Sequence, residues 1–173
     1  MMRLEGRLVS RRVGTLLHAL GQISVHAGLP WLVSLRGTRH GWLAGSPSAY
    51  NIAGCLPVVI GFLVILCCLI VHFEAAPHGW RIEKTPHYPT PAHLVTTGPY
   101  RFSRNPIYLA EAAIWLGWVV FYGSLLVLGF FSLGVLFGPN ILKREEHGLE
   151  ARFGESWRAY TRRTPRWLSW KWS

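Results

Sequence analysis

Charged residues are scarce in this sequence. Lysine, arginine, aspartate and glutamate make up 15% of its 173 residues, and 50% are hydrophobic. A soluble domain has about 25% charged residues, so the composition argues against a soluble fold. Internal repeats and low-complexity tracts are also missing, and the length suits one domain, which we expect to cover residues 1–173. Because no inverted repeat of broken helices is present, the sequence does not support a small transporter.

Patterns for metal or disulfide chemistry are missing as well. The cysteines, Cys55, Cys67 and Cys68, lie in one apolar stretch and form no C-x-x-C pair, and the eight histidines show no H-E-x-x-H spacing. Zinc sites and disulfide frameworks need such spacings. We therefore expect no metal site and interpret the cysteines as small packing residues.

Long stretches without formal charge define the candidate membrane spans, each of which needs about 20 apolar residues. Residues 50–73 form the clearest one, and residues 105–142, with Glu111 as their only formal charge, fit two spans joined by a turn near residues 122–124. Residues 13–35 form a fourth candidate, and no small-x-small cleavage site marks it as a signal peptide. The sequence thus predicts an all-α, polytopic membrane protein with about four transmembrane helices.

Basic residues are distributed unevenly around these spans. Lys and Arg number four before residue 13, four in residues 74–104 and eight in the tail from Lys143, but only Arg36 and Arg39 lie on the opposite side. Lysine and arginine concentrate on the cytoplasmic side of membrane proteins, so we expect both termini in the cytoplasm. Orientation and contact with anionic lipid headgroups account for the net charge of +10, and no nucleic-acid partner is expected.

A polar segment, GPYRFSRNPIYLAEA at residues 98–112, leads into the third span. Asn105 is suited to cap a helix, and Pro106 fits the first helical position. The free backbone N–H groups of this helix start, with Arg104 beside them, suit a carboxylate or another anion. The alternative is a basic cluster at the membrane edge.

Glu111 is the only carboxylate placed within these spans. It shares a helix face with Tyr108 and Trp115, at spacings of three and four residues. A carboxylate central in a span costs about 2.5–3.5 kcal/mol on insertion scales. We therefore expect Glu111 to face the bundle or a polar cavity, either in a structural pair with an arginine or in a functional role.

Two further carboxylates lie in the tail, within KREEHGLEARFGESWRAYTRRTPRWL. On a helix, Leu149, Phe153 and Tyr160 form one stripe, and Glu145 and Glu146 fall within about 60° of it. The tail thus predicts an amphipathic helix at the cytoplasmic face whose carboxylates meet a cation. That cation is either an arginine of the preceding loop, as a structural clamp, or a cationic cofactor.

Together, LVTTGPYRFSRNPIYL and REEHGLEARFGESWRAYTRRTPR resemble the catalytic half of integral-membrane methyltransferases, the family of isoprenylcysteine carboxyl methyltransferase and bacterial phospholipid-methyltransferase-like proteins. The resemblance covers residues 94–166. It implies a two-span N-terminal part at 1–73, and a catalytic half at 74–173 with a cofactor loop, a helical hairpin and the tail. It also implies a bacterial plasma membrane.

The resemblance implies S-adenosylmethionine as cofactor, bound on the cytoplasmic side. Apolar walls would take the adenine, the carboxylates its ammonium, and Arg104 with the helix start its carboxylate. Arg104, Glu111 and His93 are the predicted catalytic residues, the last two as candidate bases. The predicted cofactor-binding residues are Leu94, Val95, Gly98, Tyr100, Arg104, Asn105, Pro106, Tyr108, Glu145 and Glu146.

Two departures limit the substrate. The carboxyl methyltransferases carry histidine where Asn105 stands, and another histidine at the position of Ala92, where this chain has His93 one residue later. The prenylcysteine substrate is therefore not carried over. We expect methyl transfer to a lipidic or small hydrophobic acceptor among membrane lipids; the alternative is a non-catalytic lipid-binding or accessory protein that retains the fold.

Overall fold

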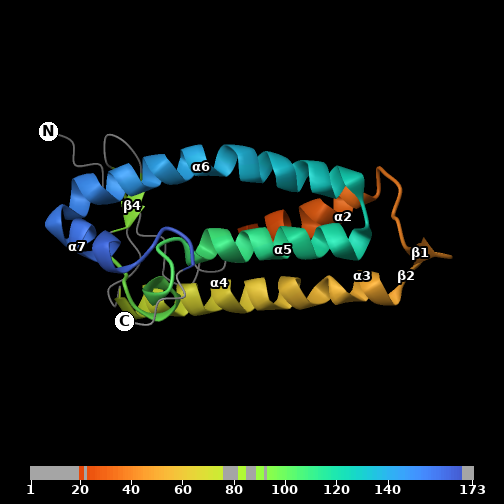
Figure 1. The fold of residues 1–173 in the computed structure, drawn as a ribbon, viewed down its shortest axis with the longest axis horizontal. Helices are drawn as coiled ribbons and strands as arrows, with labels where there is room; N and C mark the ends of the chain where they lie inside the picture. Colours follow the sequence, from red (N-terminus) through yellow and green to blue (C-terminus); the bar gives the residue numbers. More distant parts are fainter. Residues whose placement is uncertain (1–19, 22, 76–81, 85–88, 92, 169–173) are drawn as a thin grey trace, which may run out of the picture.

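The computed structural model describes residues 20–21, 23–75, 82–84, 89–91 and 93–168. The molecule is an elongated bundle of mostly helical elements (Figure 1). The predicted all-α class is confirmed, since the only strands among the described residues are those of two short hairpins.

The first long helical rod consists of α3 (Ala49–Ala53) and α4 (Cys55–Ala75), joined at Gly54. It corresponds to the predicted span at residues 50–73. A capping box starts α3: the Ser48 side chain accepts a hydrogen bond from the backbone N–H of Asn51, and the Asn51 side chain accepts one from the backbone N–H of Ser48.

Helix α5 (Pro106–Tyr122) packs along α4 through small residues. A methyl group added at Gly54 would collide with the carbonyl oxygen of Gly117, and one at Gly61 would lie 2.6 Å from the carbonyl oxygen of Ala110. Glycine and alanine therefore let the two backbones approach closely, as in many membrane helix pairs.

Helix α6 (Leu125–Phe153) returns antiparallel to α5 (Figure 1) after a turn at Gly123 and Ser124. Gly123 has a φ of 55°, and an added Cβ would strike the carbonyl of His40. Glycine suits both constraints. The predicted turn is confirmed.

Residues 143–153 form the last turns of α6, so the tail does not begin a new helix at Lys143. Gly154, with a φ of 50°, ends α6, and α7 (Glu155–Arg163) follows. Trp157 and Tyr160 of α7 are buried, whereas its arginines are exposed.

The N-terminal segment contributes η1 (Ser24–Gly28), a π-helical turn, and α2 (Leu29–Ser34), which lie beside α5. Part of the predicted span at residues 13–35 lies outside the described residues.

Short elements close both ends of the bundle. The hairpin of β1 (Trp42–Leu43) and β2 (Ser46–Pro47) lies at one end (Figure 1). The hairpin of β3 (Ile82–Lys84) and β4 (Pro89–Pro91) lies at the other end, where α7 also lies. The 3₁₀ turn η2 (Gly98–Arg101) packs against α4.

Two helical rods, Ala49–Ala75 and Leu125–Phe153, are long and apolar enough to cross a membrane. Their most apolar windows are only 28% and 11% buried, whereas the core helix of a soluble protein is buried around most of its surface. The 17-residue α5 is apolar but shorter. The number of spans therefore stays a prediction.

Candidate functional site

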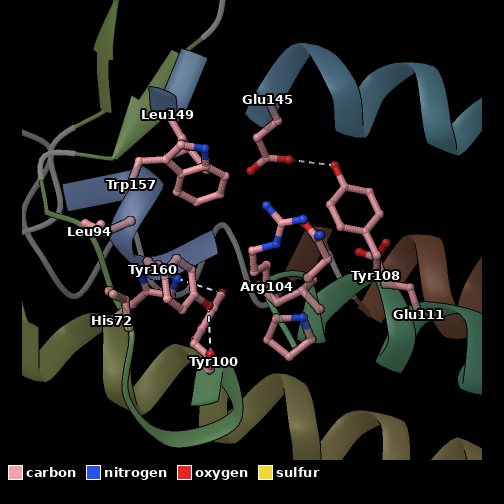
Figure 2. Close-up of a pocket in the computed structure, with 14 residues that line it drawn as sticks. His72, Leu94, Tyr100, Arg104, Tyr108, Glu111, Glu145, Leu149, Trp157 and Tyr160 are labelled. Atoms are coloured by element: carbon pink, nitrogen blue, oxygen red, sulfur yellow. Dashed lines mark hydrogen bonds between the residues drawn. The ribbon is translucent and has the colours of Figure 1, made fainter. Parts of the chain in front are cut away.

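A cavity of about 310 Å³ lies at the end of the bundle where η2, α7 and the last turns of α6 meet α4 and α5 (Figure 2). The cavity combines an apolar wall with polar groups from four helices. Its lining comprises His72, Leu94, Val95, Tyr100, Arg104, Asn105, Pro106, Ile107, Tyr108, Glu111, Glu145, Leu149, Trp157 and Tyr160.

Arg104 lines this cavity and is positioned by a backbone hydrogen bond and by packing against an aromatic ring. Its backbone N–H donates to the carbonyl of Pro165 at 2.9 Å, and its guanidinium carbon lies 5.7 Å from the ring centre of Trp157. Its Nε is buried and has no hydrogen-bond partner among the described residues. A buried donor without a partner is costly in a folded protein, so this N–H is a ready contact for an anionic ligand.

Tyr100 is fixed in the cavity by contacts with α7 and α4. Its backbone carbonyl accepts a 2.7 Å hydrogen bond from Tyr160 Oη, and its own Oη lies 2.9 Å from His72 Nε2. Burial raises the pKa of both tyrosines, which therefore remain neutral phenols at physiological pH.

Glu145 reaches the cavity from α6 and is joined to α5. Tyr108 Oη donates a 2.8 Å hydrogen bond to Glu145 Oε2 across the opening between the two helices (Figure 2). A tyrosine of α5 thus contacts this tail carboxylate, where the structural alternative expected an arginine of the preceding loop.

Glu146 does not line this cavity but is buried beside it. Arg166 donates to both of its oxygens, at 2.6 and 3.2 Å, and Arg104 Nη1 lies 3.8 Å from its Oε1. The hydrogen bond to Glu146 raises the pKa of Arg166. This geometry matches the structural clamp, with Arg166 of the tail as its main partner.

Asn105 precedes α5 as predicted, but its side chain makes no capping hydrogen bond. Its Nδ2 instead donates to the carbonyl of Arg166 at 3.1 Å and to Glu146 Oε1 at 3.4 Å. The capping expectation is therefore wrong, because the returning tail offers acceptors that the helix start does not. Asn105 joins the tail to the beginning of α5.

Of the other predicted site residues, some line the cavity and some do not. Glu111 lines the cavity, whereas His93 and Gly98 are exposed and do not. Gly98 adopts a φ of 59°, and a Cβ there would lie 2.7 Å from Val71, so glycine lets the loop pass close to α4. Glu111 is paired with a histidine, His26, and not with an arginine as the structural alternative expected.

A second cavity, of about 380 Å³, lies between α5, α6 and the N-terminal segment. Its walls are mainly apolar, with Phe130, Val135 and Leu142 from α6 and Trp115 from α5. Tyr108 and Glu111 line both cavities, so the two cavities adjoin at these side chains. The predicted common face of Tyr108, Glu111 and Trp115 is confirmed.

Several polar or aromatic residues of the two cavities were not predicted as site residues from the sequence. His72 and Trp157 both line the first cavity, although neither was a predicted site residue. Trp157 lies within the tail motif that carried the family resemblance, which was an available signal. For His26, which contacts Glu111 from 85 positions away, no local signal existed.

Fold and site define a helical protein with membrane-length apolar helices and a polar cavity at one end of the bundle. The sequence profile of the phospholipid methyltransferase family matches residues 50–156. The chain therefore belongs to the phospholipid methyltransferase family, as the resemblance predicted. No curated protein matches the chain, and no solved structure does.

Proposed function

We propose that this protein transfers a methyl group from S-adenosylmethionine to a lipidic or small hydrophobic acceptor in the membrane. The observation that carries the proposal is the junction of a polar cavity and an apolar cavity at Tyr108 and Glu111. One cavity suits a charged cofactor and the other a hydrocarbon chain, and methyl transfer requires both to meet at one point.

The side chains of the first cavity fit the cofactor group by group. The unpartnered Nε of Arg104 suits its carboxylate, Glu145 suits its ammonium, and Leu94, Leu149 and Trp157 offer apolar surface for adenine. When bound, the cofactor supplies a methyl group on an electrophilic sulfonium. The protein's part is to orient both reactants and to exclude water.

Glu145 and Glu146 take different roles in this proposal. Glu145 is the cofactor contact, positioned by Tyr108. Glu146, with Arg166 and Asn105, fastens the tail over the beginning of α5 and so maintains the shape of the cavity. His93 is exposed and lies off the cavity lining, which favours Glu111 of the two candidate bases.

The topology completes the proposal. A single domain with four spans places both termini and the first cavity on the cytoplasmic side, because 16 of the 18 Lys and Arg residues lie in segments assigned to that side. Labelling of single cysteines introduced at Ser46 and at Ser173 tests it. Equal accessibility of both from outside intact cells contradicts the topology.

The function is tested by calorimetric titration of the purified protein with S-adenosylmethionine, followed by incubation of its membranes with methyl-labelled cofactor. We expect saturable binding and label in an extracted lipid or hydrophobic compound. A protein that retains only the fold as a lipid-binding or accessory subunit would give neither.

A further inference from the structure

The junction of the two cavities contains a buried pair, His26 and Glu111. We propose that Glu111 accepts the proton that the acceptor loses during methyl transfer, and that His26 is the positioning residue that holds its carboxylate in place. This inference rests on the proposed function and assigns a role to the N-terminal segment, since His26 lies outside residues 50–156 that match the family.

The pair has a defined geometry. His26 Nε2 lies 3.3 Å from Glu111 Oε1, and Trp115 Nε1 donates a 3.2 Å hydrogen bond to His26 Nδ1. An indole N–H can only donate, so His26 Nδ1 must be an acceptor and carry no proton. The geometry therefore assigns the neutral tautomer with its proton on Nε2, directed at Glu111.

The backbone around His26 is held by a second indole. In a regular helix the N–H of residue 30 would bond the carbonyl of His26, but Pro30 has no N–H. The Trp118 indole N–H donates to that carbonyl instead. The π-helical turn at residues 24–28 is thus anchored to α5 through both its side chain and its backbone, and π-turns of this kind often mark functional sites.

Glu111 has the accessibility that a proton acceptor needs. Its side chain is 28% exposed, whereas that of His26 is 6% exposed. The contact with His26 uses Oε1, so Oε2 is the atom assigned to the acceptor. A carboxylate within an apolar helix is costly, and such residues usually have a functional role.

The proton transfer also restricts the acceptor. An acceptor atom X, which is nitrogen, oxygen or sulfur, breaks its bond to hydrogen, and the proton passes to Glu111 Oε2. An electron pair of X forms the bond to the methyl carbon, the pair of the broken C–S bond remains on sulfur, and the sulfonium and carboxylate charges are both neutralised. A carboxylate acceptor has no proton to lose and would be repelled by Glu111 and Glu145, so we exclude it.

The first test needs no turnover. In ¹⁵N-histidine-labelled protein in detergent micelles without cofactor, the His26 resonances are identified by their loss in His26→Gln. We expect the Nε2–H tautomer in the wild type and in Trp118→Phe, and its loss in Trp115→Phe. These two variants are matched, because each removes one indole donor to the same residue. An Nδ1–H tautomer in the wild type, or equal spectra for both variants, overturns the positioning role.

The second test measures methyl transfer with methyl-labelled cofactor in phosphatidylethanolamine–phosphatidylglycerol vesicles, supplemented in turn with dodecylamine, dodecanethiol, dodecanol or dodecanoate. We expect label in at least one X–H acceptor and none in dodecanoate. Glu111→Gln should lower kcat about 100-fold or more, the range for loss of a general base, with cofactor affinity within about threefold. Label in dodecanoate, or an unchanged kcat, overturns the proposal.

Paired substitutions isolate His26. His26→Leu should lower kcat about tenfold, equivalent to one hydrogen bond to a charged group, whereas His26→Gln should recover most of the loss because its amide N–H replaces Nε2–H. Equal rates for the two variants contradict the positioning role.

If the wild type neither binds cofactor nor labels any acceptor, the proposed function fails and the role of the pair fails with it. If label is transferred but these variants behave as the wild type, only the role of the pair fails.

Discussion

Each end of the bundle contains an arginine that lies over aromatic rings, and the two differ in what their remaining N–H groups meet. At the β1–β2 end, the guanidinium carbon of Arg39 lies 4.7 Å from the ring centre of Trp42 and 5.3 Å from that of Tyr122. Its Nη2 donates a 2.9 Å hydrogen bond to Ser34 Oγ. This arginine completes a local structural cluster.

At the opposite end, Arg104 packs over Trp157 in the same manner and lines the cavity, but its buried Nε has no hydrogen-bond partner in the part of the chain that the structure describes. An arginine stacked on an aromatic ring can therefore have a structural role or a ligand-binding role, depending on its remaining N–H groups. Where the guanidinium bonds a neighbouring side chain, as in Arg39, the arginine stabilises the fold; where a buried donor has no partner among the described residues, as in Arg104, that donor is available to a ligand.

The largest effect is expected at the carboxylates of the cavity end. Glu145→Gln should weaken S-adenosylmethionine binding by about 1.5–3 kcal/mol, because it removes a charge-assisted contact to the ammonium. Calorimetry on the folded variant measures this change.

Glu146→Gln is the matched control, since it makes the same substitution one residue later. It should lower the melting temperature, because Arg166 loses its carboxylate partner, and should affect cofactor affinity less. If the two variants weaken cofactor binding equally, the division between contact and clamp is wrong.

The two arginines are compared directly by conservative substitution. Arg104→Lys should reduce cofactor affinity or methyl transfer about tenfold, or about 1.4 kcal/mol, because lysine lacks the planar fork of the guanidinium. Arg39→Lys should leave both unchanged. Rates are measured across a range of cofactor concentrations, and identical behaviour of the two variants at normal stability removes Arg104 from the site.

A smaller effect is expected from the link between α5 and α6. Tyr108→Phe removes the hydroxyl that donates to Glu145 while keeping the ring, and should weaken cofactor binding by about 0.5–1.5 kcal/mol. In the Glu145→Gln background the same substitution should cost less. Fully additive losses in this double-mutant cycle would show that the hydrogen bond does not position Glu145.

The smallest effect on the site is expected from the opposite end of the bundle. Trp42→Phe removes the 2.9 Å hydrogen bond from Trp42 Nε1 to the carbonyl of Phe121 and should lower the free energy of unfolding by about 0.5–1.5 kcal/mol. Cofactor affinity should stay unchanged. A loss of affinity at unchanged stability would mean that the two ends of the bundle are coupled.

The features that the sequence predicted correctly are local ones. The turn at residues 122–124 and the start of α5 at Pro106 follow from residues with restricted or unusual backbone preferences, which act within a few positions of themselves. The alignment of Tyr108, Glu111 and Trp115 follows from helical periodicity alone. The family resemblance, from motifs at residues 94–166, is borne out by the profile match.

What only the tertiary structure decided is which partner each polar group meets. Helical arithmetic placed Glu145 and Glu146 near one stripe, but the position of the cavity and of Arg166 separates them into a cavity residue and a clamp. Asn105 bonds the returning tail and not its own helix start. His26 reaches Glu111 across 85 positions, because helix packing brings the N-terminal segment against α5. Local patterns fix where a helix starts and which face is apolar, whereas contacts between distant helices depend on how those faces pack together.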